Sequence, residues 1–382
     1  MAGSARLPGA PVVQPHPPID VLVNAAGAWN TVRVQQPFEG LRQLGWDVRI
    51  HEPPLDLNQA IRPHSLVIWQ RPVPQSWAMW RHVVQGIRRR HGLLLLEWDD
   101  HPDLFPAEVQ QRMQACEHAQ LRMVHALHCS CPALARALQR FHPHALVAEN
   151  GVAPIPPLNL AKHSGDRPLR VFLGNLNRLE EHRQLLPALA DWLRDDPDIT
   201  LVCVGPTGLE GQLPSGRVEQ HPLLDYPIYR QLLASCQLAL LPLSAGTAQA
   251  GKTPIKWLEA AAESTAVVGG PELYRPWLDS TQAGVWAPSL EQIVPAARQL
   301  AADAGLRQEI ALNAHQAAQQ HALPQQLVWR QELYQHLWRL RTALDKQLLM
   351  RWPELLNESD TLRPINMDRS SHAPQSHPQH QG

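Results

Sequence analysis

Residues 238–270 read LALLPLSAGTAQAGKTPIKWLEAAAESTAVVGG, and this stretch decides the fold. An apolar strand at 238–243 leads through a loop of small residues to a helix at 254–263. A second apolar strand follows at 266–269. Two short apolar strands joined by a helix are the repeating unit of a parallel α/β sheet, so the segment predicts a βαβ unit.

The start of this helix has the chemistry of an anion site. Thr253 is a good N-cap and Pro254 a favoured first helical residue, so the helix is expected to begin beside Lys252. Free amide groups and the positive end of the helix dipole face whatever lies in front. Lys256 follows one turn later, and Glu259 lies on the same face three residues further on. These groups fit a nucleotide diphosphate: the lysines and the start of the helix would bind the phosphates, and Glu259 would bind a ribose diol. The alternative is a capped surface helix with an ordinary Lys–Glu pair.

The scarcity of lysine favours the first interpretation. The 34 basic residues include only four lysines, Lys162, Lys252, Lys256 and Lys346, and the others are arginine. A lysine that persists in such a background is more often there for chemistry, whereas Lys162 and Lys346 are expected to be solvated. The formal net charge of -1 argues against a nucleic-acid or membrane-surface binder with a broad cationic face, and leaves room for one small cationic pocket.

Length and composition set further bounds. A chain of 382 residues with 44% hydrophobic residues can form two well-packed domains. Five cysteines at irregular spacing predict neither a disulfide framework nor a structural zinc, and the 20 histidines form no metal-binding pattern. The longest strong apolar run, residues 93–96, is strand-sized, and the first 18 residues lack the apolar core of a signal peptide. We therefore expect a cytoplasmic protein with no metal and no cofactor, although peripheral membrane association stays open.

The alternation of apolar strands and amphipathic helices extends along most of the chain. Strands are expected at residues 19–24, 47–51, 65–70, 93–98, 126–130, 145–149, 169–173, 199–204, 218–221, 238–243 and 266–269. Helices are expected at residues 34–44, 75–90, 107–121, 132–140, 179–194, 228–234, 254–263, 290–302, 306–320 and 325–348. This order predicts an α/β protein of two Rossmann-like doubly wound domains, with ligands bound in a cleft off the carboxyl ends of the strands.

Changes in composition suggest the domain boundaries. The expected divisions are a disordered leader at 1–18, a first domain at 19–152, a proline-rich linker at 153–168, a second domain at 169–324, a final helix at 325–352, and a disordered tail at 358–382.

Several motifs then occur in a characteristic order. They are the Leu41, Gly45 and Val48 turn, the Glu97–Asp100 strand end, residues 128–135, the Glu149–Val152 segment, Phe172–Asn175, residues 229–243, and the KTPIKWLEAAA segment at 252–262. This order resembles GT-B glycosyltransferases, and most closely the retaining family 4 type (glycosyl transferases group 1). The resemblance spans about residues 19–345.

The resemblance implies that the second domain binds a nucleotide-diphosphate sugar as donor and that the first domain binds the acceptor. It also implies that the final helix returns to the first domain. It places Gly174, Asn175, Arg178, Lys252, Lys256 and Glu259 at the donor. It further implies that lysine and arginine neutralise the leaving diphosphate, that no metal is required, and that the anomeric configuration is retained without a protein nucleophile.

Two departures from the family pattern stand out. The family's first donor glutamate, eight positions before Glu259, is replaced by Gly251, which puts the sugar identity and the activity in question. The lysine expected on the first helix of the second domain is missing, so that His182 or Arg183 would have to substitute.

The acceptor-side candidates lie on the first domain. Glu97, Asp99 and Asp100 end the strand at 93–98 and could bind an acceptor hydroxyl, accept its proton or hold a divalent cation; a turn with solvated acids is the alternative. Gly27 permits close approach of a ligand to the loop at 24–30, and an ordinary βα turn is equally consistent with it.

The expected function is transfer of a sugar from a nucleotide-diphosphate sugar to an unidentified acceptor, by a hexosyltransferase-like enzyme. Two other functions stay open: a non-catalytic nucleotide-sugar-binding protein, motivated by Gly251, and an NAD-dependent oxidoreductase. The second is disfavoured because no Gly-x-Gly-x-x-Gly follows the first strand. Cys129 and Cys131 are expected to be buried structural thiols, and no catalytic residue is assigned.

Overall fold

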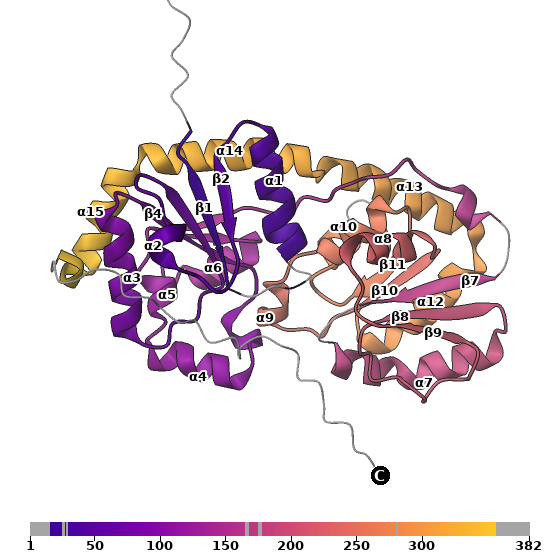
Figure 1. Ribbon diagram of the computed structural model, residues 1–382. Coiled ribbons are helices and arrows are strands. Elements are labelled where there is room, and N and C mark those ends of the chain that lie inside the picture. Colours follow the sequence, from indigo (N-terminus) through magenta and orange to yellow (C-terminus); the bar gives the residue numbers. More distant parts are fainter. Residues whose placement is uncertain are drawn as a thin grey trace, which may run out of the picture.

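The computed structural model describes residues 16–24, 27, 30–164, 168–174, 178–279 and 282–356. It has two α/β lobes side by side, each built on one six-stranded sheet (Figure 1). The expected disordered leader, apart from residues 16–18, and the expected tail at 358–382 lie outside the described residues.

The first sheet is entirely parallel and has the strand order β2-β1-β3-β4-β5-β6. Its strands are β1 (Ile19–Val23), β2 (Val48–His51), β3 (Leu66–Gln70), β4 (Leu93–Trp98), β5 (Ala126–Cys129) and β6 (Ala145–Val147). All six were expected from apolar runs, and their ends agree within two residues. The direction of winding reverses between β1 and β3, and such a switch point is where doubly wound sheets place ligands.

The second sheet is also parallel, with the order β12-β11-β10-β7-β8-β9. Its strands are β7 (Leu169–Leu173), β8 (Ile199–Val204), β9 (Val218–His221), β10 (Leu238–Pro242), β11 (Ala266–Gly270) and β12 (Val285–Trp286). The two-residue β12 was not expected, because it is too short to leave an apolar pattern. The switch point falls between β7 and β10, so the segments after these two strands, from Gly174 and from Leu243, lie beside each other.

Helices cover both faces of each sheet. In the first lobe they are η1 (Thr31–Gln35), α1 (Gln36–Gln43), α2 (Leu57–Ala60), α3 (Trp77–Arg89), η2 (Pro102–Leu104), α4 (Ala107–Ala115), α5 (Ala119–Arg122) and α6 (Pro132–Leu138). In the second they are α7 (Leu179–Asp195), α8 (Tyr226–Ala234), α9 (Thr247–Ala250), α10 (Ile255–Ala262), α11 (Arg275–Asp279), η4 (Leu290–Gln292), α12 (Ile293–Ala302) and α13 (Ala304–Gln320). Successive strand residues alternate between the two hydrophobic cores of each lobe, as a sheet buried on both faces requires.

The chain finally returns along the first lobe as α14 (Leu323–Arg339) and α15 (Arg341–Arg351), drawn in gold and yellow in Figure 1. Leu327 and Leu337 of α14 belong to the core on one face of the first sheet. Gly40 of α1 allows this approach, because a Cβ there would lie 2.5 Å from Cδ1 of Leu327. A single helix at 325–348 was expected; the structure divides it at Leu340. The residue boundaries of the domains stay predictions.

The linker is tied to the second lobe by a lysine that was expected to be solvated. Lys162 Nζ donates to the carbonyls of Ala234 at 3.1 Å and Glu263 at 2.8 Å, and to Thr265 Oγ1 at 2.8 Å. Its ammonium therefore satisfies carbonyl groups at the ends of α8 and α10. Burial lowers the pKa of Lys162 to about 7. The expectation of a solvated lysine was wrong, because the acceptors come from segments more than 70 residues away.

Candidate active site

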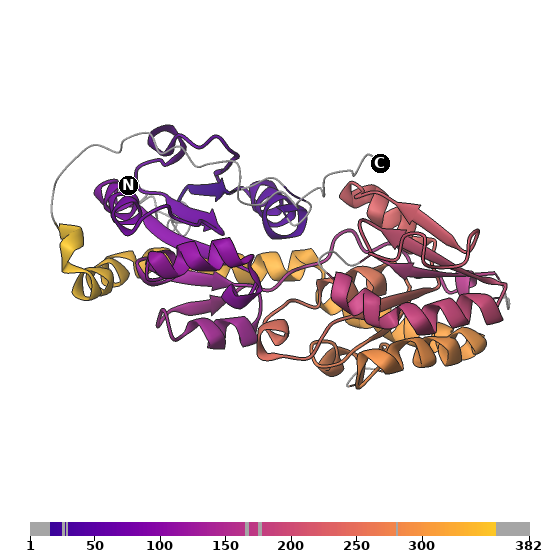
Figure 2. The same ribbon diagram turned by 90° about the horizontal axis from the view of Figure 1, so that it is seen from below.

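The carboxyl edges of the two sheets meet at a junction that three hydrogen bonds bridge. Short helix α9 lies where the lobes meet (Figures 1 and 2) and packs against η2 of the first lobe. Asn150 Nδ2 donates to Thr253 Oγ1 at 3.0 Å, and Cys131 Sγ donates to the carbonyl of Gly251 at 3.3 Å. The third is an ion pair between Lys252 and Asp100. The loop before α10 is thus held against the first lobe.

The beginning of α10 differs from the expected one. The helix starts at Ile255, and its N-cap position is Pro254, which has no side chain that could cap it. Thr253 was expected to cap the helix, but its hydroxyl accepts the bond from Asn150 instead. Part of the expected loop of small residues folds as α9, and the amide of Lys252 donates to Gln249 O at 3.0 Å. Lys252 lies three positions before Ile255, so the helix does not begin directly beside it as predicted.

Lys256 and Glu259 lie on one face of α10, as their spacing predicted. Lys256 Nζ is 3.1 Å from Glu259 Oε2, and it also donates to the hydroxyl of Tyr229 at 3.2 Å. Its ammonium lies 4.4 Å from the centre of the Tyr229 ring, in a cation–π arrangement. The Glu259 side chain is buried, with 2% of its surface exposed, whereas that of Lys256 is 31% exposed. Lys256 is therefore the accessible member of the pair.

Tyr229 on α8 begins one of the motifs that resemble the family, but the sequence did not predict it as a site residue. Its hydroxyl donates to Glu259 Oε2 at 3.0 Å. Burial, followed by the charge of Glu259, raises the pKa of Tyr229 well above its usual value, so the hydroxyl stays protonated and available as a donor. Tyr229 thus fixes the orientation of the Glu259 carboxylate.

The segment after β7 supplies only one of the two cations expected there. Arg178 is the N-cap residue of α7, and its charge acts on Asp100 of the other lobe. His182 is fully buried, its Nδ1 lies 3.1 Å from Thr207 O, and burial lowers its pKa, so it is not a cation. Arg183 is 68% exposed and pairs with Glu180 on the outside of α7. Neither His182 nor Arg183 substitutes for the missing lysine.

Gly174 follows β7 directly, and Asn175 lies outside the described residues. A Cβ at Gly174 would lie 2.4 Å from the Phe172 ring, so glycine is required here for packing. Asn175 and the role of Gly174 toward a donor stay predictions.

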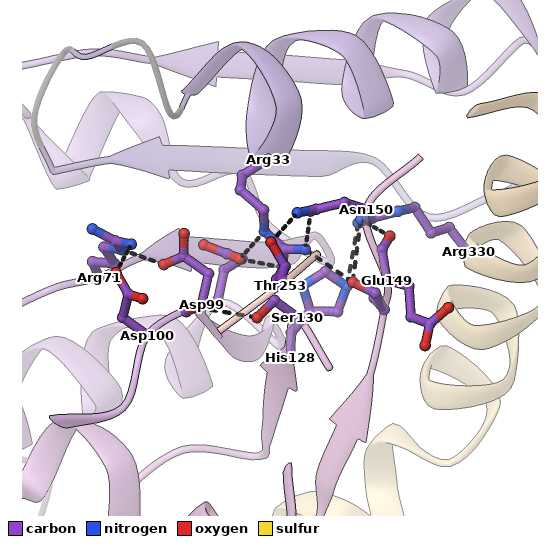
Figure 3. A network of polar contacts seen from close by, with 12 residues as sticks. Arg33, Arg71, Asp99, Asp100, His128, Ser130, Glu149, Asn150, Thr253 and Arg330 are labelled. Carbon is purple, nitrogen blue, oxygen red and sulfur yellow. Dashed lines mark hydrogen bonds and ion pairs between the residues drawn. The ribbon is translucent and has the colours of Figure 1, made fainter. Parts of the chain in front are cut away.

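On the first lobe, Glu97 is closed off within a buried network, whose members Arg33 and Asn150 are labelled in Figure 3. Arg33, from the π-helical turn η1, donates through Nε to Glu97 Oε1 at 2.6 Å, and both side chains are at most 3% exposed. Arg33 Nη1 also donates to Ala148 O at 2.9 Å and to Asn150 Oδ1 at 2.8 Å. Burial raises the pKa of Glu97 to about 7 in spite of Arg33. Glu97 was an acceptor-side candidate, but its contacts are with the protein interior.

Asn150 connects this network to the second lobe. Its Oδ1 accepts from Arg33, and its Nδ2 donates to Thr253 (Figure 3). Because Arg33 also donates to Glu97, hydrogen bonds connect Glu97 to the loop before α10. Arg330 of α14 adds a second buried guanidinium, which donates to Glu149 O at 3.0 Å. The crossing helix therefore contacts the same edge of the first sheet.

Asp99 and Asp100 lie at the junction and share one arginine. Arg71 donates through Nε to Asp99 Oδ1 and through Nη2 to Asp100 Oδ2, the latter at 2.9 Å. The backbone of Arg71 has a φ of +44°, an unusual conformation for a residue with a side chain. Asn24 Nδ2 donates to its carbonyl at 3.2 Å. Arg71 thus sits at the switch point, beside the loop that carries Gly27.

The remaining candidates were Gly27, the two thiols and a metal. Gly27 O accepts from Asn30 N at 3.0 Å, as in an ordinary βα turn; whether it approaches a ligand stays a prediction. Cys129 and Cys131 are buried as expected, and burial raises the pKa of Cys129 to about 12. In the described part of the chain no three His, Cys, Asp or Glu side chains gather as a metal site. None of the helices described there is long and apolar enough to cross a membrane.

Gly251, which replaces the family's first glutamate, is part of the junction. A Cβ there would lie 3.2 Å from the carbonyl oxygen of Ala248, and 3.6 Å from His101 Cβ and 3.7 Å from Leu134 Cδ1 on the first lobe. A methyl group would therefore make only ordinary contacts with the first lobe, but it would press on the backbone of α9. A longer side chain would have to displace first-lobe residues.

Three functional candidates left no signal in the sequence. Arg33, Arg71 and Arg330 are among thirty arginines, and each lies in a segment with no site motif. The strand order brings Arg33, after β1, and Arg71, after β3, to the site, and the packing of α14 on the first lobe brings Arg330.

Comparison with known proteins starts from the second lobe. Residues 181–332, less than half of the chain, match a family model described as glycosyl transferase-like. No curated protein matches the sequence.

Solved structures extend the comparison to both lobes. A UDP-forming α,α-trehalose-phosphate synthase from Burkholderia vietnamiensis has a TM-score of 0.60 at 12% identity, over 86% of this chain and 98% of that one. HepE of Anabaena, in complex with UDP and glucose, has a TM-score of 0.58 at 15% identity, over 84% of this chain and all of that one.

The fold is GT-B. Both of these similarities span the two lobes and establish the architecture that the resemblance implied. TarM has a TM-score of 0.50 at 11% identity over 79% of this chain, which spans 57% of the TarM chain. Identities this low establish the fold alone.

Proposed function

We propose that the protein is a glycosyltransferase that moves a sugar from a nucleotide-diphosphate sugar to an acceptor bound by the first domain. One observation carries the proposal. Lys252, Lys256 and Arg178 lie on the two segments that follow the switch-point strands of the second sheet. Both lysines fall within the stretch that matches the glycosyl transferase-like model. Cations at a switch point fit a diphosphate.

The cations would act on the leaving group. As the bond between the sugar's anomeric carbon and the diphosphate oxygen breaks, negative charge develops on the diphosphate. Positive groups fixed in advance at that position stabilise the transition state, and such electrostatic stabilisation is often the largest catalytic contribution. Lys256 would contact the phosphates, while Glu259, oriented by Tyr229, is proposed to bind a ribose hydroxyl.

Retention of the anomeric configuration and hexose transfer are the finer parts of the proposal. They come from the resemblance to family 4, in which no protein nucleophile is needed. Closure of the two domains would exclude water from the reacting centre. Since HepE was solved with UDP and glucose and the trehalose-phosphate synthase is UDP-forming, UDP-sugars are the first donors to test.

Turnover of the donor tests the proposal. Lys256→Ala and Glu259→Ala are expected to lower kcat/KM for donor hydrolysis or transfer by about 10- to 100-fold, the loss typical of one charged hydrogen bond. Lys346→Ala is the matched control, because Lys346 is an exposed lysine on α15. Unchanged turnover in both site variants would show that the site is misassigned.

One observation favours a second candidate function, a non-catalytic nucleotide-sugar-binding protein. Gly251 supplies no carboxylate where the family has its first glutamate, and the position is occupied by a contact with the first lobe. This candidate predicts nucleotide-sugar binding without hydrolysis or transfer. Measuring affinity and turnover on the same preparation separates it from the enzyme.

A further inference from the structure

Asp100 of the first domain lies among cations that come from both domains. Its Oδ1 is 2.8 Å from Lys252 Nζ, and its Oδ2 is 2.9 Å from Arg71 Nη2. Burial acts to raise the pKa of Asp100, but the charges of Arg71, Lys252 and Arg178 outweigh it, so the pKa is lowered. A permanent anion therefore occupies this point of the junction.

Two of these cations are the ones proposed to bind the donor diphosphate. A carboxylate oxygen and a phosphate oxygen offer an ammonium group the same contact, a charged acceptor at hydrogen-bond distance. Asp100 thus makes with Lys252 the contact that a donor phosphate would make. The carboxylate and the diphosphate cannot both be the principal partner of one ammonium group.

We propose that Asp100 is an internal anion that holds Lys252 until the diphosphate of the donor replaces it. The inference rests on the proposed function, since it takes Lys252 as a diphosphate ligand. It gives Asp100 a role in donor binding, whereas the sequence suggested a contact with the acceptor.

The contacts of the two residues suit such an exchange. The Lys252 and Asp100 side chains are 19% and 25% exposed, so the pair is not closed off from solvent. Asp100 keeps Arg71 as a partner after Lys252 leaves, so no carboxylate is left unpaired. The bonds from Asn150 to Thr253 and from Cys131 to Gly251 hold the loop nearby. The exchange then needs only a movement of the Lys252 side chain.

Affinity measurements with Asp100→Asn test the proposal. UDP, GDP and inorganic pyrophosphate are titrated into the full-length wild type and the variant at one low ionic strength, because salt screens the pair. Asp100→Asn is expected to tighten binding of pyrophosphate, and of the nucleotide that the wild type binds, by roughly three- to tenfold, since the competing anion is gone.

Asp99→Asn is the matched control. It removes the same charge one residue away, and Asp99 shares Arg71 but has no contact with Lys252. Any general effect of the lost charge on anion binding therefore appears in both variants, and only Asp100→Asn should add to it. In a Lys252→Ala background the advantage of Asp100→Asn should disappear. Asp100→Ser provides the same comparison if the asparagine variant does not fold.

Two failures can be told apart. The inference is overturned if the wild type binds these probes and Asp100→Asn binds them equally or more weakly. It is also overturned if Asp99→Asn tightens binding as much as Asp100→Asn does. In both cases the proposed function stands. If no diphosphate binds to the wild type or to any variant, the proposed function fails, and the inference fails with it.

Discussion

Glu97 and Asp100 stand three residues apart at the end of one strand, yet their surroundings are opposite. Glu97 is buried against Arg33 inside the first domain, and burial raises its pKa to about 7. Asp100 is partly exposed at the junction, and the surrounding cations lower its pKa. The two carboxylates of this acidic cluster therefore have different roles: Glu97 stabilises the edge of the sheet, while Asp100 faces the other domain.

The largest expected effect comes from breaking the buried pair. Arg33→Met should lower the free energy of unfolding by about 3–5 kcal/mol, because Glu97 would be left buried without its partner. Urea unfolding followed by circular dichroism measures the change. An effect below about 1 kcal/mol would contradict the view that Glu97 belongs to the interior.

The pH dependence of stability also tests whether Glu97 is buried in the interior. The folded-state pKa of Glu97 is about 7, above its ordinary value of 4.5, so the folded state keeps a proton that the unfolded state has lost. The contribution of Glu97 to stability is therefore greatest below pH 4.5. It falls by about 1.4 kcal/mol for each pH unit up to about 7.

Glu97→Gln should remove this component. The difference in unfolding free energy between wild type and variant is expected to change between pH 5 and 7 and to stay constant above pH 8. A difference that does not vary with pH across this range would show that burial does not raise the pKa of Glu97.

The smallest effect on stability is expected at the junction. Gly251→Glu places a long side chain against His101 and Leu134, so it should separate the domains while changing the unfolding free energy by less than about 1 kcal/mol. Small-angle X-ray scattering should show a larger radius of gyration. Gly251→Ala is the control, since its Cβ makes only ordinary contacts with the first lobe, and it should leave the scattering unchanged.

The sheets could be predicted because buried parallel strands leave continuous apolar runs, and the Lys256–Glu259 pair because helical spacing is a local property. Features set by distant residues could not be predicted. The hydroxyl of Thr253 is taken by Asn150, 103 residues away, in place of the expected cap. The helix expected at 107–121 is interrupted at Glu117 and His118, whose positive φ values leave no mark in an amphipathic pattern.

We propose that the second domain binds a nucleotide-diphosphate sugar through Lys252 and Lys256. Calorimetric titration of the wild type with NAD and with a panel of UDP- and GDP-sugars tests it most directly, alongside Lys256→Ala. We expect the wild type to bind at least one nucleotide sugar, and Lys256→Ala to weaken that binding about tenfold or more. Binding of NAD alone would contradict the proposal.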